Sequence, residues 1–482
     1  MKPQNLLILF SDEHNPKVMG AAGHPFIATP NLDALAKRGT RFTQATTPCP
    51  ICVPARASLA TGRYNHEIGF WDNADPYEGS VRSWHHAVRD AGHRVVSIGK
   101  LHFRGAPGDD HGFSEERIAM HVIEGKGDLL ALNRGPDALP RAGARKLIGM
   151  AGPGESDYTR YDRDITAQTQ IWLREQAPLF SDKPWVLFVS LVAPHFPLTA
   201  PPEHYYRYAL GDLPMPKQYA QAERPHHPHL DEYARVIPYD ASMRGPADVR
   251  RALAGYFGLV SFLDEQIGKI LATLTQSGLD QTTRILYTAD HGDNNGARGL
   301  WGKSTFYEES VGVPMILAGP DVPSGLTVTT PTSLVDVDAT VCEAIGLTAR
   351  PSSGQSLFKL LESPHADRMI LSEYHATGSR EAAFMVQDQR YKYLRYVSYP
   401  AQLYDRQNDP EELVDIASDP ASAPVIHRME EALRAWLDPV EVDARAKRRQ
   451  ADMLAANGGW DTVMRRGDLP YSPPPGVPAN WN

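Results

Sequence analysis

Short apolar runs alternate with helical patterns through most of the chain, and this alternation limits the fold more than any other feature. The runs are rich in aliphatic and aromatic residues and cover residues 6–10, 94–98, 185–191, 284–288 and 314–317. The helical patterns cover residues 30–38, 83–91, 165–175, 246–277 and 334–345. Chains in which strands and helices alternate form α/β folds around a largely parallel sheet. We therefore predict an α/β main domain with a large mixed, mostly parallel sheet flanked by helices.

Polar and charged side chains follow the predicted strands. In open α/β sheets, ligands bind at the carboxyl ends of the strands. We therefore expect one functional site that gathers the residues found there, which are Asp12, Lys100, His102, His195, Asp290 and His291.

The helical run that ends at Gly62 is preceded by Cys52 and contains Arg56. The first turn of a helix offers unpaired N–H groups and a positive dipole end to an oxyanion. Arg56 adds a planar fork of donors for the same anion. A cysteine at this place could act as a thiolate nucleophile, or it could be a buried structural residue.

The pattern Cys-x-Pro-x-Arg at residues 52–56, followed by Ala-Ser-Leu and by Thr-Gly at 61–62, resembles the signature of the type I sulfatases. Further motifs occur in the order of that family at residues 11–12, 29–33, 99–102, 194–197, 290–293 and 299–303. The resemblance implies an alkaline-phosphatase-like fold. It also implies that Cys52 is oxidised by a maturation enzyme to formylglycine, whose hydrate attacks the sulfur of a sulfate ester.

The resemblance implies a metal site as well. Asp12, Asp290 and His291, with residue 52 itself, are expected to hold one divalent ion. Carboxylates from distant strand ends suit Ca²⁺, Mg²⁺ or Mn²⁺. Glu13 is a weaker ligand candidate, because neighbouring residues on an extended segment point apart.

The remaining roles are also carried over from the family. Arg56 and His102 are expected to hold the hydrated aldehyde, and Lys100 to contact both it and the sulfate. His195 and Lys303 are expected to bind the ester oxygens, and one of them to protonate the leaving group. Taken singly, each lysine could be a solvated surface residue and each histidine a structural one.

Asn73 lies in a segment that resembles choline sulfatases and phosphonate monoester hydrolases, in which an Asn contacts the sulfate or phosphonate. Phosphonate hydrolases lack the Lys-x-His pair that Lys100 and His102 form here, which favours sulfate esters. Choline sulfate, aryl sulfates and other alkyl sulfates stay open as substrates, and a phosphonate monoester or phosphodiester hydrolase is the alternative. A quaternary ammonium group would favour an aromatic face. Trp71 and Trp301 are near motif residues, but packing also explains aromatic side chains there.

The sequence changes character after about residue 365. Residues 369–373, 382–386 and 391–396 are predicted to form antiparallel strands, and residues 424–436 a helix. We expect a catalytic domain at 1–365 and a smaller α+β domain at 366–482. Its charged and Pro-rich tail resembles that of choline sulfatases, where the tail crosses to a neighbouring subunit. A homodimer or homotetramer is therefore expected, with a tail that is disordered unless it docks on a partner.

Composition excludes several other classes. The net charge of −9 does not favour a nucleic-acid binder or a membrane-surface protein. No run approaches the roughly 18 apolar residues of a membrane span, and no signal-peptide pattern begins the sequence, so a cytoplasmic enzyme is expected. The three cysteines are too few for a disulfide framework. Cys49 and Cys52 form a Cys-x-x-Cys pattern, but a redox or zinc site would need further partners. Cys342 lies in a helical apolar pattern and is expected in the core. A non-enzymatic binding protein on a sulfatase scaffold is the rival from another class.

Overall fold

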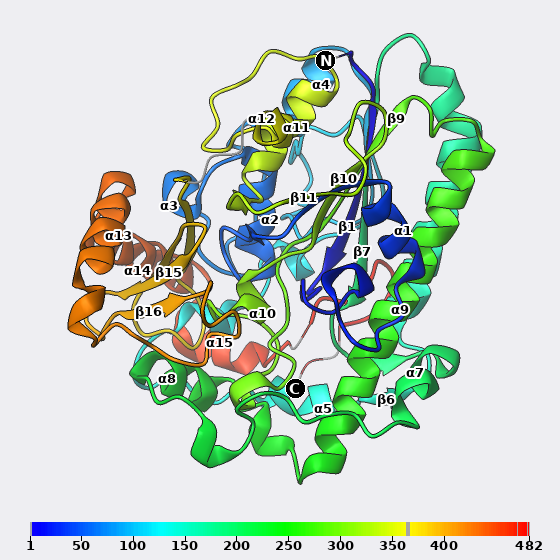
Figure 1. Cartoon of the computed structure of the whole chain (residues 1–482). Helices are drawn as coiled ribbons and strands as arrows, with labels where there is room; N and C mark the ends of the chain where they lie inside the picture. Colours follow the sequence, from blue (N-terminus) through cyan, green and yellow to red (C-terminus); the bar gives the residue numbers. More distant parts are fainter. Residues whose placement is uncertain (1, 363–366, 470, 480, 482) are drawn as a thin grey trace.

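An eight-stranded sheet forms the centre of the protein in the computed structural model, which describes residues 2–362, 367–469, 471–479 and 481 (Figure 1). In sheet order its strands are β11 (Leu326–Val328), β2 (Gly39–Phe42), β10 (Met315–Ala318), β9 (Thr283–Ala289), β1 (Asn5–Asp12), β7 (Val186–Pro194), β4 (Val95–Lys100) and β5 (Glu115–Met120). β10 is antiparallel to both of its neighbours, and all other pairs are parallel. The predicted mixed, mostly parallel sheet is confirmed.

Helices cover both faces of this sheet, which explains why the central strands are apolar at nearly every position. One face packs against α1 (Pro30–Lys37), α6 (Asp157–Ile171) and α9 (Pro246–Gln276). The other face packs against α2 (Cys52–Thr61), α4 (Trp84–Asp90), α11 (Asp336–Ala344) and α12 (Leu357–Glu362). The long helix α9 runs along one side of the molecule in Figure 1.

Shorter elements surround this core. The helices are α3 (Asn65–Ile68), α5 (Arg145–Gly149), α7 (Pro202–Ala209), α8 (Pro228–Val236) and α10 (Glu308–Val311). The strands β3 (Ala45–Thr46) and β12 (Thr332–Ser333) form one small pair, and β6 (Gly152–Pro153) and β8 (Thr199–Ala200) form another.

The C-terminal part carries a separate antiparallel sheet. Its strands, in order, are β13 (Ile370–Tyr374), β14 (Ala383–Gln387), β15 (Tyr391–Tyr396) and β16 (Gln402–Asp405). Helices α13 (Ala423–Trp436), α14 (Pro439–Ala456) and α15 (Trp460–Arg466) follow, on the opposite side of the molecule from α9 in Figure 1. The three predicted antiparallel strands and the helix at 424–436 are confirmed. The expected domain boundary at 365 falls in residues 363–366, outside the described residues.

The helix expected at 30–38 ends at Lys37, Arg38 caps it, and Gly39 already begins β2. A Cβ atom there would lie 2.4 Å from the carbonyl oxygen of Leu317 on β10, so the close approach of two strands requires this glycine. The tail from about residue 440, expected to be disordered unless it docks on a partner, begins with α14 and α15, which are ordered on their own chain.

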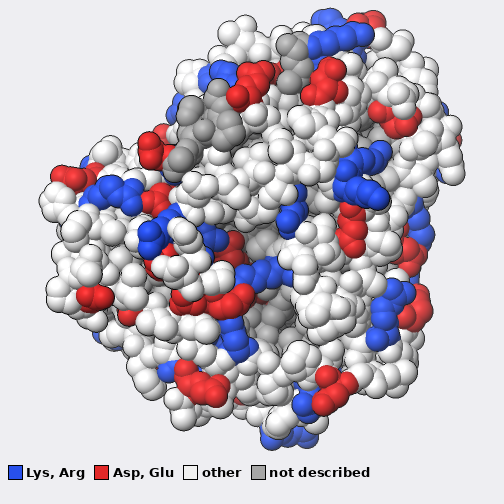
Figure 2. Space-filling model, in the orientation of Figure 1, with Lys and Arg blue, Asp and Glu red and all other residues white. Residues whose placement is uncertain are grey.

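Acidic and basic side chains are interspersed on the face shown in Figure 2. Among the described residues, none of the helices combines the length and apolar character that crossing a membrane requires.

Candidate active site

The predicted site residues meet at the carboxyl ends of four neighbouring strands. Asp12 ends β1, Lys100 ends β4, His195 follows β7, and Asp290 follows β9. The N-terminus of α2 faces the same edge of the sheet and presents Cys52. These groups lie at or beneath a cavity of about 110 Å³.

Cys52 is the first residue of α2 and is only 1% exposed. Its Sγ lies 2.9 Å from Lys303 Nζ and 3.2 Å from His291 Nε2. Asp12 Oδ1 is 3.7 Å away from the same sulfur. Asn73, which lines the cavity, accepts a hydrogen bond from the Val53 amide in the first turn of the helix.

The ionisation of Cys52 bears on the thiolate alternative. Burial, together with the nearby carboxylate of Asp12, raises the pKa of the Cys52 thiol to about 11. At neutral pH the side chain is therefore a neutral thiol. A catalytic thiolate needs the opposite shift, which helix termini and cations usually provide. The raised pKa thus gives no support to an unmodified cysteine nucleophile.

Arg56 binds the two carboxylates instead of pointing at Cys52. Its Nε donates to Asp290 Oδ2 at 2.9 Å, and one terminal nitrogen donates to Asp12 Oδ2 at 2.8 Å. The other terminal nitrogen donates to the Lys100 carbonyl and to Ser190 Oγ. Lys100 Nζ lies 2.6 Å from the same Asp12 oxygen. The guanidinium of Arg56 thus holds both carboxylates in place. These contacts differ from the predicted contact between Arg56 and the hydrated aldehyde.

One group of donors fits a divalent metal. The side chains of Asp12, Cys52, Asp290 and His291 each offer a donor atom, and these atoms lie within 4.8 Å of one another. His291 Nδ1 contacts the Gly292 carbonyl, which leaves Nε2 directed at the cluster. Burial opposes the charged form of Asp12, but Lys100, His195 and Arg56 hold its pKa well below the ordinary value. An ionised carboxylate in such a set is what a hard cation requires.

Glu13 also turns toward the site, because its backbone has φ = 68°. This left-handed conformation breaks the alternation that an extended segment would have, so Asp12 and Glu13 face the same side. Glu13 Oε2 lies 3.4 Å from His195 Nε2 and 3.5 Å from Lys303 Nζ. Burial raises the pKa of Glu13 well above its ordinary value. The sequence did not reveal this orientation, because the local dihedral angle was not visible; Glu13 as a weaker ligand candidate stays a prediction.

Two histidines that line the cavity, His102 and His195, have lowered pKa values that favour the neutral ring. Burial and the charge of Lys303 keep the pKa of His195 well below its ordinary value. Burial and the neighbouring Lys100 do the same for His102. Neither ring nitrogen of His102 has a hydrogen-bond partner among the described residues, although both are buried. His102 lines the cavity, so these nitrogens are available to a bound ligand.

The loop that carries Asp290 and Lys303 is fastened at both ends. The Asn294 amide and side chain both donate to the Gly302 carbonyl, at 2.6 and 2.7 Å, and Asn294 Oδ1 accepts from Thr305. The Ser304 amide donates to the Pro50 carbonyl, which ties the loop to the segment before Cys52.

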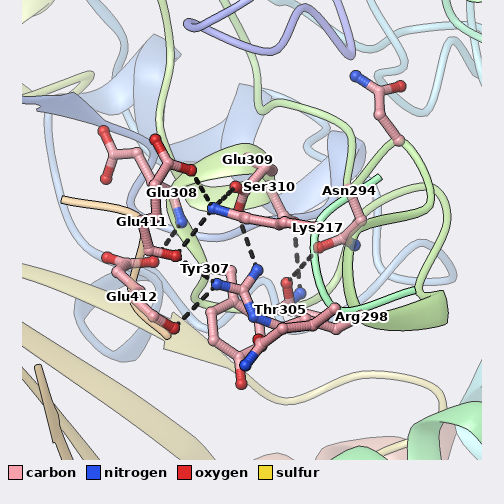
Figure 3. Close-up of polar contacts among 12 residues, drawn as sticks. Lys217, Asn294, Arg298, Thr305, Tyr307, Glu308, Glu309, Ser310, Glu411 and Glu412 are labelled. Carbon is pink, nitrogen blue, oxygen red and sulfur yellow. Dashed lines mark hydrogen bonds and ion pairs between the residues drawn. The ribbon is translucent and has the colours of Figure 1, made fainter. Parts of the chain in front are cut away.

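A buried ion network supports the same loop from outside (Figure 3). Arg298 has φ = 59° and donates to the carbonyl oxygens of Glu411 and Glu412 at 2.7 and 2.9 Å. Its guanidinium lies 3.6 Å from the Tyr307 ring centroid and reaches Glu309. Lys217 contacts Glu309 and Glu411 in the same network.

Comparisons with known proteins agree with this geometry. The family model described as "Sulfatase" matches residues 4–347. The chain belongs to the sulfatase family. A second model, the C-terminal region of N-sulphoglucosamine sulphohydrolase, matches residues 296–438. The enzyme is a sulfuric ester hydrolase, as predicted.

Individual relatives of this sulfatase span most of its length. It is 32% identical to choline-sulfatase of Rhizobium meliloti (strain 1021) over 434 residues, 86% of this chain and 83% of that protein. It is 27% identical to arylsulfatase K of Bos taurus over 86% of this chain and 78% of that one. The solved phosphonate monoester hydrolase of Agrobacterium radiobacter superposes with a TM-score of 0.71 at 23% identity, covering 92% and 96% of the two chains.

The cavity of this sulfatase has walls that sequence reasoning did not identify. Its aromatic residues are Phe196, Tyr233, Tyr239 and Tyr471. Trp71 and Trp301 are not among its lining residues; both are buried in the core. The motifs beside these two tryptophans did not indicate which aromatic residues line the cavity, because segments that are distant in the sequence form its walls.

Part of the wall comes from the C-terminal tail of the same chain. Asp468 pairs with Arg141, which also pairs with Asp128, and all three line the cavity. The Tyr158 hydroxyl donates to the Ser472 carbonyl. A tail that crosses to a neighbouring subunit, and the expected dimer or tetramer, stay predictions.

Proposed function

We propose that this sulfatase hydrolyses sulfate monoesters with a formylglycine made from Cys52 and one divalent metal held by Asp12, Asp290, His291 and residue 52. The observation that carries the proposal is the convergence of these four donors within 4.8 Å, with Lys303 Nζ 2.9 Å from the sulfur. In this chain Cys52 Sγ stands where an oxygen of the hydrated aldehyde would be. The hydrate would supply the nucleophile, and the Ca²⁺, Mg²⁺ or Mn²⁺ ion would neutralise the charge of the sulfate.

The chain's own residues would bind and orient the ester. Burial lowers the pKa of the Lys303 ammonium, but the surrounding acidic groups, with the carboxylates of Asp12 and Asp290 among them, raise it well above its ordinary value, so Lys303 holds its proton. It therefore offers a fixed positive charge to the sulfate oxygens. Lys100, His195 and Asn73 complete the ring of groups for those oxygens, and His102 offers its unpartnered nitrogens to the hydrate. Arg56 keeps Asp12 and Asp290 in place.

The leaving group needs a proton as the ester bond breaks, and His195 and Lys303 are the candidates. His195 Nδ1 contacts the Phe196 carbonyl at 2.6 Å, which assigns the proton of the neutral ring to that nitrogen. Its Nε2 would then accept a proton before donating one, with Glu13 at 3.4 Å as the nearest acid. Lys303 is already charged, and we therefore assign it the role of proton donor.

The substrate class follows from the cavity. A volume of about 110 Å³ suits a small alcohol, and the aromatic rings suit a cationic one. Asp128 and Asp468 share the single cation Arg141, so together these three wall residues add one net negative charge. Choline sulfate is therefore the first substrate to test, followed by aryl sulfates. Phosphonate monoesters are the alternative, because solved phosphonate monoester hydrolases share this fold.

The test is co-expression with a formylglycine-generating enzyme, followed by mass spectrometry of the Cys52 peptide. Oxidation of a cysteine to formylglycine lowers the mass by about 18 units. The matched control is Cys49→Ala, which removes a buried cysteine three positions away and should leave both the modification and the turnover in place. Full activity in a Cys52→Ala variant would refute the proposal. Faster turnover of phenyl phosphonate than of every sulfate ester would select the alternative.

A further inference from the structure

A second group of possible metal ligands lies at the outer edge of the main sheet, away from the sulfatase donors. It consists of His111 before β5, Glu116 within β5, and His121 directly after it. One atom from each side chain lies within 4.8 Å of the others. Nothing in the sulfatase chemistry uses these residues, because the proposed nucleophile and metal lie on other segments.

The three side chains share one carboxylate. Glu116 Oε1 lies 2.9 Å from His111 Nδ1, and Glu116 Oε2 lies 3.3 Å from His121 Nε2. The group is therefore two imidazole rings that share one carboxylate.

The outward nitrogens of the two rings have no partner. His111 Nε2 and His121 Nδ1 are buried and make no hydrogen bond among the described residues. The His111 ring is 4% exposed, and the rings are 5.3 Å apart between centroids. The nitrogens that face the Glu116 carboxylate carry the ring protons and donate to it. A metal bound by these nitrogens would displace their protons, and the buried Nε2 of His111 and Nδ1 of His121 would then carry the proton of each neutral ring.

A bulge in β5 brings Glu116 and His121 to the same face. Residues five apart on a regular strand point to opposite faces. Between the pairs Ile98–Arg117 and Lys100–Met120, β5 advances three positions while β4 advances two, so β5 carries one extra residue. The extra step coincides with Ile118, whose φ of 41° is unusual for a β-branched residue. Bulges commonly re-aim side chains near functional sites.

We propose that His111, Glu116 and His121 form a second metal site that takes a borderline transition ion such as Zn²⁺, Co²⁺ or Ni²⁺. Two imidazoles and one carboxylate form the ligand set that such ions accept, with water in the open positions. The sulfatase donor group has two carboxylates and is suited to harder ions. The two sites would therefore differ in their metal preference.

The site would fix the edge of the sheet next to the sulfatase centre. Met120 precedes His121, and its carbonyl accepts from the amides of both Leu101 and His102. A metal held by residues on both sides of the bulge would keep this strand in register with β4. Its effect would thus be structural, acting on the backbone behind His102.

In the experiment, Co²⁺ and Zn²⁺ are titrated into the full chain after a chelator has removed any bound metal. Binding is measured by visible absorption and by calorimetry. Four proteins are compared: the unaltered chain, His121→Ala, Asp290→Asn and His427→Ala. His427 forms an exposed pair with Glu431 and serves as a matched control. We expect two sites in the unaltered chain and in His427→Ala. His121→Ala should lose the Co²⁺ site that Asp290→Asn retains, with affinity lowered at least about 100-fold.

Thermal unfolding gives a second readout. Zn²⁺ should raise the Tm of Asp290→Asn but not that of the double variant Asp290→Asn/His121→Ala. A Glu116→Gln variant, which keeps the shape of the side chain, should behave like His121→Ala. Equal metal binding by the unaltered chain and His121→Ala would overturn the proposal and leave Glu116 as an ordinary ion-pair partner of two histidines. This result is independent of whether Cys52 is modified.

Discussion

Lys303 Nζ lies 2.9 Å from Cys52 Sγ, although 251 positions separate the two residues in the chain. The contact depends on the loop after β9, which Asn294 closes on itself and which Ser304 ties to the segment before α2. The ammonium group that contacts Cys52 therefore comes from a loop whose shape is fixed by its own hydrogen bonds.

Lys303→Met should lower kcat by about 10² to 10³-fold, because a preorganised charge at the reacting group is lost. If Lys303 is also the proton donor, the loss should be greatest for esters with poor leaving groups. Steady-state kinetics with aryl sulfates of graded leaving-group pKa measure this. His195→Asn provides the comparison, and Lys269→Met, which removes an exposed lysine, is the control. A steeper leaving-group dependence in His195→Asn than in Lys303→Met would assign the proton to His195.

Arg298→Met should lower kcat/KM by about 10²-fold, although Arg298 is not expected to contact the substrate. The variant should shift the loop of Lys303, and a small misplacement of a catalytic group lowers the rate by about this factor. The variant removes the donors to Glu411 and Glu412 that hold the loop of Lys303 (Figure 3). Arg390→Met, which breaks an exposed pair with Asp405, is the matched control. Kinetics are measured on folded protein, checked by circular dichroism. Unchanged kcat/KM together with a lowered Tm would limit Arg298 to a role in stability.

Asp290→Asn should lose about 10² to 10³-fold in activity and bind its divalent metal more weakly, since one charged ligand is removed. Prolonged chelation of the unaltered enzyme should have the same effect. Addition of Ca²⁺, Mg²⁺ or Mn²⁺ should restore activity at lower concentrations in the unaltered enzyme than in the variant. Activity that resists chelation in both proteins would argue against a metal at this cluster.

Glu373→Gln should destabilise the fold most at neutral pH. Glu373 is fully buried and contacts His66 Nδ1 at 2.7 Å and His375 Nε2 at 2.9 Å. Burial raises its pKa, but His66 and His375 bring the pKa well below the ordinary value of 4.5. A lowered carboxyl pKa contributes stability above the unfolded value and loses it as the pH falls. The expected loss is about 3 kcal/mol at neutral pH.

Chemical unfolding of both proteins between neutral pH and about pH 3 checks this prediction. The difference in unfolding free energy should shrink as the pH falls below about 4.5. A difference that stays constant over this range would show that the charge of Glu373 is not what stabilises the contact. Glu431→Gln, at an exposed helix position, is the control.

The sequence allowed the strand ends to be found because buried strands in a covered sheet are apolar at every position. Asp12, Lys100 and Asp290 could be assigned to one edge since parallel strands share their carboxyl ends. Arg56 shows the limit of this reasoning. Its place on α2 was predictable, but its binding to two carboxylates depends on side chains brought together from the ends of β1 and β9.

The misses have a common physical cause. Glu13 and Ile118 have positive φ angles that residues of their types adopt rarely, so the pattern gave the wrong facing for Glu13 and no hint of the bulge in β5. The tail beyond residue 440 is polar because α14 and α15 bury only narrow faces. A charged sequence with such a stripe is difficult to distinguish from a solvated arm.

Because Cys52 is buried in the folded protein, its oxidation by another enzyme would have to come before folding. A residue that is 1% exposed in the first turn of a buried helix cannot lie in the cleft of another protein once the sheet has closed around it. An enzyme that oxidises this cysteine therefore has to meet the nascent or unfolded polypeptide. Protein that folds first would remain a thiol form for the rest of its lifetime, and late addition of the oxidising partner would not rescue it.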